Sequence, residues 1–135
     1  MRLAQAIIMA KRVYVIGNGG SAANALHIAN DLFSCGVRAH ALAADVSTLT
    51  ALANDFGFEN VFSAQIAIYG EAGDLLIALS GSGKSPNILR AIETADAIGM
   101  NIERIFGNGK GMQEAEQEQL RLGHEAMLWL RSHKQ

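Results

Sequence analysis

Two glycine-rich stretches of the chain carry hydroxyl and amide side chains of the kind that bind phosphate groups. Residues 17–21 are Gly-Asn-Gly-Gly-Ser, and residues 80–85 are Ser-Gly-Ser-Gly-Lys-Ser. A glycine-rich turn between a strand and a helix presents backbone N–H groups at the positive end of the helix, and nearby serine hydroxyls add donors. For one loop alone, tight turns with Ser21 or Ser85 as helix N-caps explain the pattern equally well. Two such loops at one edge of a sheet favour a phosphate site.

His27 and Asp31 are a second group whose types and spacing suit chemistry. They are four residues apart in the alanine-rich stretch that follows Ser21. In a helix, this spacing places both side chains on one face. An imidazole and a carboxylate on one face can converge on a substrate or on a metal ion.

An alternation of apolar runs and helix-like stretches must position these residues. The strands expected are 13–16, 39–43, 74–79 and 101–106. The helices expected start at Ser21, cover 48–54, start at Pro86 with Ser85 as the N-cap, and cover 113–131. Residues 54–57 predict a turn, and 107–111 form a third glycine loop. This alternation predicts an α/β fold with a doubly wound parallel sheet, in which ligands bind at the carboxyl ends of the strands.

The composition predicts a single globular domain. The chain has 135 residues, of which 50% are hydrophobic and 18% are charged, with no unbroken run long enough to cross a bilayer. The formal net charge is -2 and the basic residues are scattered, which excludes an electrostatic surface for nucleic acid or an anionic membrane. The single cysteine, Cys35, excludes an internal disulfide and suits the cytoplasm.

Two nucleotide-binding patterns also match parts of these loops. Residues 17–22 fit the dinucleotide pattern G-x-G-x-x-G/A, with Asp45 as the residue for a ribose, but this leaves the serine-rich loop unexplained. Residues 78–85 fit a relaxed Walker A pattern that includes Lys84. However, Ala78 replaces its first glycine, and little chain remains for the magnesium-binding elements of an NTPase. Both patterns are retained as alternatives.

Several motifs in consistent order resemble the sugar isomerase (SIS) domain family, and within it the sedoheptulose 7-phosphate (phosphoheptose) isomerases. The motifs are Gly-Asn-Gly-Gly-Ser at 17–21, Asn-Asp-Phe-Gly-Phe at 54–58, Gly-Asp at 73–74 and Ser-Gly-Ser-Gly-Lys-Ser-Pro-Asn at 80–87. The resemblance covers Lys11 to about Gly111 and resumes from about Met112. It implies a flavodoxin-like SIS fold and an aldose–ketose isomerase that acts on a sugar phosphate.

The resemblance also implies binding residues in the loops. It implies that the phosphate is held by Ser80, Gly81, Ser82 and Ser85, and that the sugar lies near Asn18, Gly19, Gly20, Ser21 and Asp55. Asp55 has an alternative role as a turn residue before Gly57. The implied partner is a small-molecule sugar phosphate, with no nucleic acid and no membrane.

Metal and catalytic residues are implied in the same way. Family members carry His-x-x-x-Glu as metal ligands and base where this chain has His27 and Asp31. The shorter carboxylate shifts the base by about 1 Å, which costs on the order of 100-fold in rate if nothing compensates. His124 corresponds to the closing histidine, an acid/base that contacts the metal. Glu116 corresponds to a Gln or Glu ligand, so the implied zinc set is His27, Asp31, Glu116 and His124.

Alternatives remain open at the last helix and for the function. Glu116 lies about 12 Å from His124 along a helix, Gln117 competes with it, and an exposed face explains 114–119 equally well. The chain departs from the family in a shortened N-terminal helix and in the missing fifth strand near 111–112. We expect a cytoplasmic homo-oligomer, dimer or tetramer, that acts in heptose and lipopolysaccharide biosynthesis. The alternative is a non-catalytic module that binds a sugar phosphate or serves as a protein adaptor.

Overall fold

The computed structural model describes residues 2–133 and has one parallel sheet. The strands lie in the order β2-β1-β3-β4, and their bounds are β1 Val13–Ile16, β2 Ala39–Ala41, β3 Leu75–Ser80 and β4 Asn101–Phe106. All four strands lie where the sequence predicts them, although β2 ends two residues early. The α/β fold with a parallel sheet flanked by helices is therefore confirmed.

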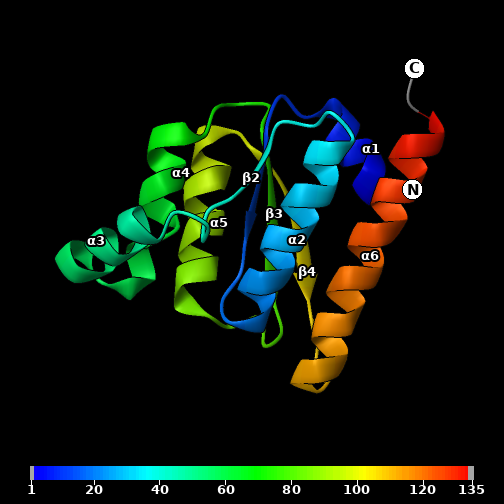
Figure 1. The fold of residues 1–135 in the computed structure, drawn as a ribbon. Helices are drawn as coiled ribbons and strands as arrows, with labels where there is room; N and C mark the ends of the chain where they lie inside the picture. The colour runs from blue at the N-terminus through cyan, green and yellow to red at the C-terminus, as the bar shows by residue number, and fades with distance from the viewer. Residues whose placement is uncertain (1, 134–135) are drawn as a thin grey trace.

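Helices cover both faces of this sheet (Figure 1). Helices α1 (Arg2–Met9), α2 (Gly20–Ser34) and α6 (Met112–His133) pack on one face. Helices α4 (Ser63–Tyr69) and α5 (Pro86–Ile98) pack on the other. Helix α3 (Val46–Phe56) and the short 3-10 helix η1 (Phe58–Asn60) lie beside α4 and α5. The sheet is thus wound on both sides, as the alternation of strands and helices predicts.

Alternation along the strands builds the two cores. In β1, Val13 and Val15 point into the core beneath α1, α2 and α6, whereas Tyr14 and Ile16 point into the core beneath α4 and α5. Successive side chains of a strand face opposite sides of the sheet. The central strand β3 is buried along its whole length, as expected for a parallel strand covered on both faces.

Helices α2 and α6 run side by side in the same direction (Figure 1). Hydrogen bonds join Asn24 to Gln119, His27 to His124 and Ser34 to Arg131, and the two partners are 95 to 97 residues apart in each case. A constant separation is possible only if the helices are parallel and keep one register. Starting from the carboxyl edge of the sheet, successive turns of α2 therefore contact successive turns of α6.

Two sequence predictions about the helix ends are wrong, and a third is confirmed. Helix α2 begins at Gly20 with Gly19 as its N-cap, so Ser21 is buried in the first turn and is not a cap. Asn54 and Asp55 are part of α3 and do not form a turn, because Leu49, Leu52 and Ala53 pack on the second core and extend the helix to Gly57. The prediction for α5 is confirmed in position, because Ser85 is its N-cap and Pro86 is its first residue, although the Ser85 side chain makes no capping hydrogen bond.

The far edge of the sheet is formed by β4. Among residues 2–133 there is no fifth strand, and residues 107–111 lead directly from β4 into α6. Within the same range, no helix has the combined length and apolarity needed to span a bilayer. The sequence did not predict η1 and α4, which fill residues 58–69.

Candidate active site

The two glycine-rich loops meet at the carboxyl edge of the sheet. Side chains from both loops line one hollow of about 70 Å³, together with Leu79 and Met112. The predicted phosphate and sugar residues that line it are Asn18, Ser21, Ser80, Gly81, Ser82 and Ser85. Gly19 and Gly20 lie at the start of α2, directly beside Ser21. The structure therefore brings together most of the loop residues that the sequence singled out.

Backbone groups of the second loop orient its serine hydroxyls. Ser80 Oγ accepts a hydrogen bond from the Gly83 N–H at 2.9 Å, and Ser82 Oγ accepts one from the Lys84 N–H at 3.1 Å. Because each oxygen already accepts a hydrogen bond, its own O–H is free to donate to an anion. The hollow can therefore present hydroxyl donors at the N-terminal end of α5, where the helix dipole also favours negative charge.

An amide pair ties the first loop to the start of α5. The side chains of Asn18 and Asn87 exchange two hydrogen bonds, of 2.8 and 2.9 Å. Asn87 is buried, so this pair holds the two loops at a fixed separation. Asn18 thus positions the loop at the predicted sugar site.

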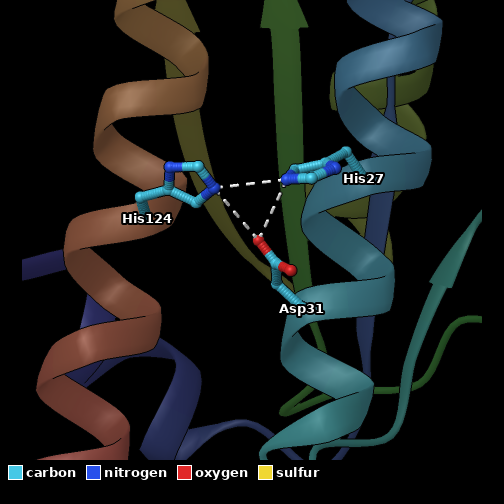
Figure 2. A group of neighbouring side chains, drawn as sticks. All are labelled: His27, Asp31 and His124. Atoms are coloured by element: carbon cyan, nitrogen blue, oxygen red, sulfur yellow. Dashed lines mark hydrogen bonds and ion pairs between the residues drawn. The ribbon is translucent and has the colours of Figure 1, made fainter.

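Three side chains converge between α2 and α6. Figure 2 shows His27 and Asp31 on α2 facing His124 on α6. The Nε2 atoms of the two histidines lie 3.2 Å apart, and Asp31 Oδ2 lies 3.3 Å from His27 Nε2 and 3.6 Å from His124 Nε2. These are the only three potential metal-binding side chains among residues 2–133 whose ligand atoms all lie within 4.8 Å of one another.

The cluster has the features of a metal site. Asp31 Oδ2 is buried and has no hydrogen-bond partner, although both imidazole nitrogens are near it. A buried polar atom without a partner is costly and calls for an explanation. Tetrahedral zinc with bonds of about 2.0–2.1 Å separates its ligand atoms by about 3.3 Å, and the three distances in the cluster are 3.2, 3.3 and 3.6 Å. The donors therefore fit a zinc ion.

Other predicted site residues lie apart from this cluster. The Glu116 carboxylate packs against Gly20 and leaves no room for a Cβ at that residue. Gly20 is at the N-terminal end of α2, where the helix dipole favours a negative charge. Gln117 is exposed on α6. Asp55 is exposed on α3, where it accepts a hydrogen bond from Asn54.

The residues of the two nucleotide-binding patterns have other roles. Asp45 is the N-cap of α3 and accepts hydrogen bonds from the N–H and the hydroxyl of Thr48, which lower the pKa of its carboxyl. Residues 78–80, the start of the Walker-like pattern, belong to β3, and Lys84 is exposed. Asp45 is thus explained as a helix cap. Residues 78–80 are strand residues and do not form the loop that a Walker A motif requires.

Asn24 and Gln119 are buried polar residues that the sequence interpretation missed. Both lie between α2 and α6 and bond to each other. The interpretation of 114–119 as an exposed face is wrong for Ala115 and Gln119. The signal was present, since the buried positions of α6 are spaced by three or four residues: Ala115, Gln119, Gly123, Ala126 and Leu130.

Comparison with known proteins identifies the family. The SIS domain family matches residues 2–107. The chain belongs to the SIS domain family. This match spans the sheet and both glycine-rich loops of the SIS domain, and it stops before α6, which carries His124.

Phosphoheptose isomerases are among the proteins similar to this chain. The one from Burkholderia pseudomallei (strain K96243) is 48% identical over 106 residues, which cover 74% of this chain and 54% of that protein. The one from Coxiella burnetii (strain RSA 493 / Nine Mile phase I) is 42% identical over 115 residues, which cover 81% of this chain and 58% of that protein. The chain thus spans little more than half the length of these relatives.

Solved structures of phosphoheptose isomerases share the fold of this SIS domain. The structure from Neisseria gonorrhoeae has a TM-score of 0.89 at 30% identity and covers 96% of this chain and 81% of that chain. The structure from Francisella tularensis has a TM-score of 0.90 at 27% identity and covers 97% of this chain and 83% of that chain. The expected resemblance to the SIS family and to its phosphoheptose isomerases is confirmed.

Proposed function

We propose that this SIS domain protein is an aldose–ketose isomerase that converts sedoheptulose 7-phosphate to D-glycero-D-manno-heptose 7-phosphate. One observation carries the proposal. A single helix, α2, starts at the loop hollow and holds His27 and Asp31 against His124 farther along its length. The hollow suits the phosphate end of an extended sugar, and the cluster suits its carbonyl end. The phosphoheptose isomerases similar to this chain support the same substrate.

His27, Asp31 and His124 would hold the zinc ion of this enzyme. When bound, zinc would polarise the substrate carbonyl or order the site. Its positive charge would also compensate the buried Asp31 oxygen that lacks a hydrogen-bond partner. Glu116 would join this set only if its side chain left Gly20.

The reaction transfers a proton between neighbouring carbons through an enediol. In the direction from ketose to aldose, a base removes a proton from C1, and a proton is returned to C2 while the carbonyl passes from C2 to C1. We assign Asp31 as the base and His124 as the acid/base that serves the oxygens. Ser80, Ser82 and Ser85 would anchor the phosphate, so that binding energy from the remote end of the sugar positions the reacting carbons.

The biological setting is also a proposal. The product would supply heptose for lipopolysaccharide and other cell-envelope carbohydrates, as the activity named for the relatives suggests. We further propose that the protein is a cytoplasmic homo-oligomer, a dimer or a tetramer.

An assay of purified protein over a panel of ketose phosphates, with and without zinc, tests the proposed reaction. We expect turnover of sedoheptulose 7-phosphate that requires zinc and that His124→Ala reduces by at least 100-fold, the usual contribution of a general acid/base. His133→Ala is the matched control, because His133 is exposed near the end of the same helix. Turnover that survives His124→Ala would contradict the assigned role.

A non-catalytic sugar-phosphate module is the second candidate. The observation that favours it is Asp31, whose carboxylate is shorter than the glutamate that the family resemblance leads one to expect. Such a module would be stabilised against heating by sedoheptulose 7-phosphate but would not convert it. Zinc-dependent conversion by the wild-type protein excludes this candidate.

A further inference from the structure

Two buried polar side chains between α2 and α6 have no part in the proposed chemistry. Gln119 on α6 is 1% exposed and Asn24 on α2 is 8% exposed. Gln119 Nε2 donates to Ser21 Oγ at 3.0 Å, and Gln119 Oε1 accepts from Asn24 Nδ2 at 2.9 Å. Asn24 Nδ2 also donates to the backbone oxygen of Glu116 at 3.0 Å. The three side chains form one hydrogen-bonded network across the helix pair.

This network can form in only one register of the two helices. Sliding α6 by one turn would move its side chains by about 5.4 Å. Gln119 would then lose both partners, and its buried amide would be left unpaired. An unpaired buried amide destabilises the fold more than an apolar side chain of the same shape at that position. An apolar contact between α2 and α6 would penalise such a slide much less, because hydrophobic burial has no direction.

The same register places the metal ligands. Gly123 lies against Ile28, where a Cβ on Gly123 would be 2.7 Å from Ile28 Cγ1, so the helices approach closely one residue before His124. His124 then meets His27 and Asp31, with the two histidine rings 5.3 Å apart between centroids. The imidazoles themselves are half exposed, so they do not lock the helices together. The register of the two helices must therefore be fixed by their buried contacts nearer the loops, which are those of Gln119 and Gly123.

We propose that Gln119 is a positioning residue of the metal site. It fixes the register of α6 on α2 and thereby holds His124 beside His27 and Asp31. The inference rests on the proposed function for the identity of the metal, but the placement of His124 is a property of the metal-free protein as well. Because Gln119 also bonds Ser21, the network joins the metal site to a residue that lines the loop hollow.

The test compares Gln119→Met with Gln113→Met. Methionine has about the length of glutamine but cannot form these hydrogen bonds, and Gln113 is exposed on the same helix. In the metal-free protein we measure the NMR cross-relaxation between the ring protons of His27 and His124. In parallel we measure zinc affinity by competition with a chromophoric chelator. The double variant Asn24→Leu with Gln119→Met, which leaves no unpaired amide, is measured beside them.

We expect folded Gln119→Met to lose the contact between the histidine rings and to bind zinc at least tenfold more weakly. Substitution of a residue that orients a metal ligand commonly lowers metal affinity by that factor or more. Gln113→Met should match the wild type. An unchanged ring contact and zinc affinity in folded Gln119→Met or in the double variant would overturn the proposal. If both variants fail to fold, Gln119 has a general structural role, which overturns it equally. A wild type that binds no zinc but keeps the ring contact would refute the proposed metal and not the positioning.

Discussion

At the scale of single residues, Asp31 links the stability of the metal-free protein to the proposed metal site. Its Oδ2 atom is buried without a hydrogen-bond partner and lies 3.3 Å from His27 Nε2 and 3.6 Å from His124 Nε2. A metal-free protein therefore bears the cost of a poorly compensated carboxylate, which a bound cation would remove. Such unsatisfied groups gather at sites where function needs them.

Asp31→Asn should stabilise the metal-free protein and abolish its response to zinc. An amide can donate a hydrogen bond to a neutral imidazole, so the variant relieves a penalty of about 1 kcal/mol, the lower end for a buried unsatisfied group. Thermal unfolding with a chelator and then with zinc measures both effects. A variant that unfolds at a lower temperature than the wild type in chelator, or that zinc still stabilises, would count against the metal site.

Some residue roles could be predicted from sequence and others could not. His27 and Asp31 are close in sequence, so helical spacing alone places them on one face. His124 is 97 residues from His27, and only the family resemblance indicated it. The burial of Gln119 could not be predicted from the acidic stretch around it, because burial depends on the face of α6 that meets α2.

At the scale of elements, the contact of α6 with α2 is the feature on which the site depends. The two helices approach closely at Gly123, and the residue that it faces is Ile28. The parallel arrangement lets neighbouring turns of the two helices supply His27 and Asp31 on one side and His124 on the other side of the proposed metal site. The match to the SIS family stops at residue 107, before α6, so this pairing is the part of the site that most needs a direct test.

Gly123→Ala should separate the two helices and weaken zinc binding. Alanine gains about 1 kcal/mol of helix propensity over glycine, but overpacking at a buried contact costs about 1–3 kcal/mol. We therefore expect a net loss of stability of about 1 kcal/mol, measured by urea unfolding, together with a lower zinc affinity.

Gly111→Ala is the control for this substitution. Gly111 lies just before α6, and a Cβ there would meet nothing within 4 Å. Equal zinc affinity in Gly123→Ala and in the wild type would show that the close approach at Gly123 does not position His124.

Helix α3 offers a pH-dependent test of its N-cap. Hydrogen bonds from Thr48 lower the pKa of Asp45 below its ordinary value of 3.8. The charged cap thus stabilises the fold above that value, and this stabilisation is lost as the pH falls through the pKa of the folded state. Urea midpoints of Asp45→Ala should lie below those of the wild type at pH 7, and the two should converge in acid.

Asp96→Ala serves as the comparison for the cap. Asp96 is exposed on α5, and its carboxylate makes no hydrogen bond with any residue that the structure describes. It should therefore show no such convergence. A difference between wild type and Asp45→Ala that stays constant down to pH 3 would rule out a charged cap.

The positions of the strands were predicted from the sequence more accurately than the ends of the helices. Apolar runs located β1 and β3, because a parallel strand buried on both faces has few polar residues. The edge strand β4 is not buried and contains Glu103 and Arg104, so its signal was weaker. The sequence did not predict that Asn54 and Asp55 extend α3, since Asn-Asp-Phe-Gly also suits a turn and only packing on the second core decides between them. Local pattern cannot report such long-range contacts.

At the scale of the whole molecule, the proposed function requires the fold to separate phosphate binding from the reacting carbons along one helix. The carboxyl edge of the sheet gathers the glycine and serine loops, and α2 leads from that edge to the cluster of His27, Asp31 and His124. A sugar with its phosphate at one end and its carbonyl at the other matches this separation. The parallel sheet is essential, because it brings loops that are far apart in sequence to one edge.

The most direct test of this account is an NMR spectrum of sedoheptulose 7-phosphate incubated in D₂O with the zinc-loaded protein. Proton exchange with solvent during the enediol step predicts a heptose 7-phosphate aldose that carries deuterium at C2. A ketose spectrum that stays unchanged and unlabelled, with folded protein and bound zinc, would contradict the assignment of this SIS domain as an isomerase.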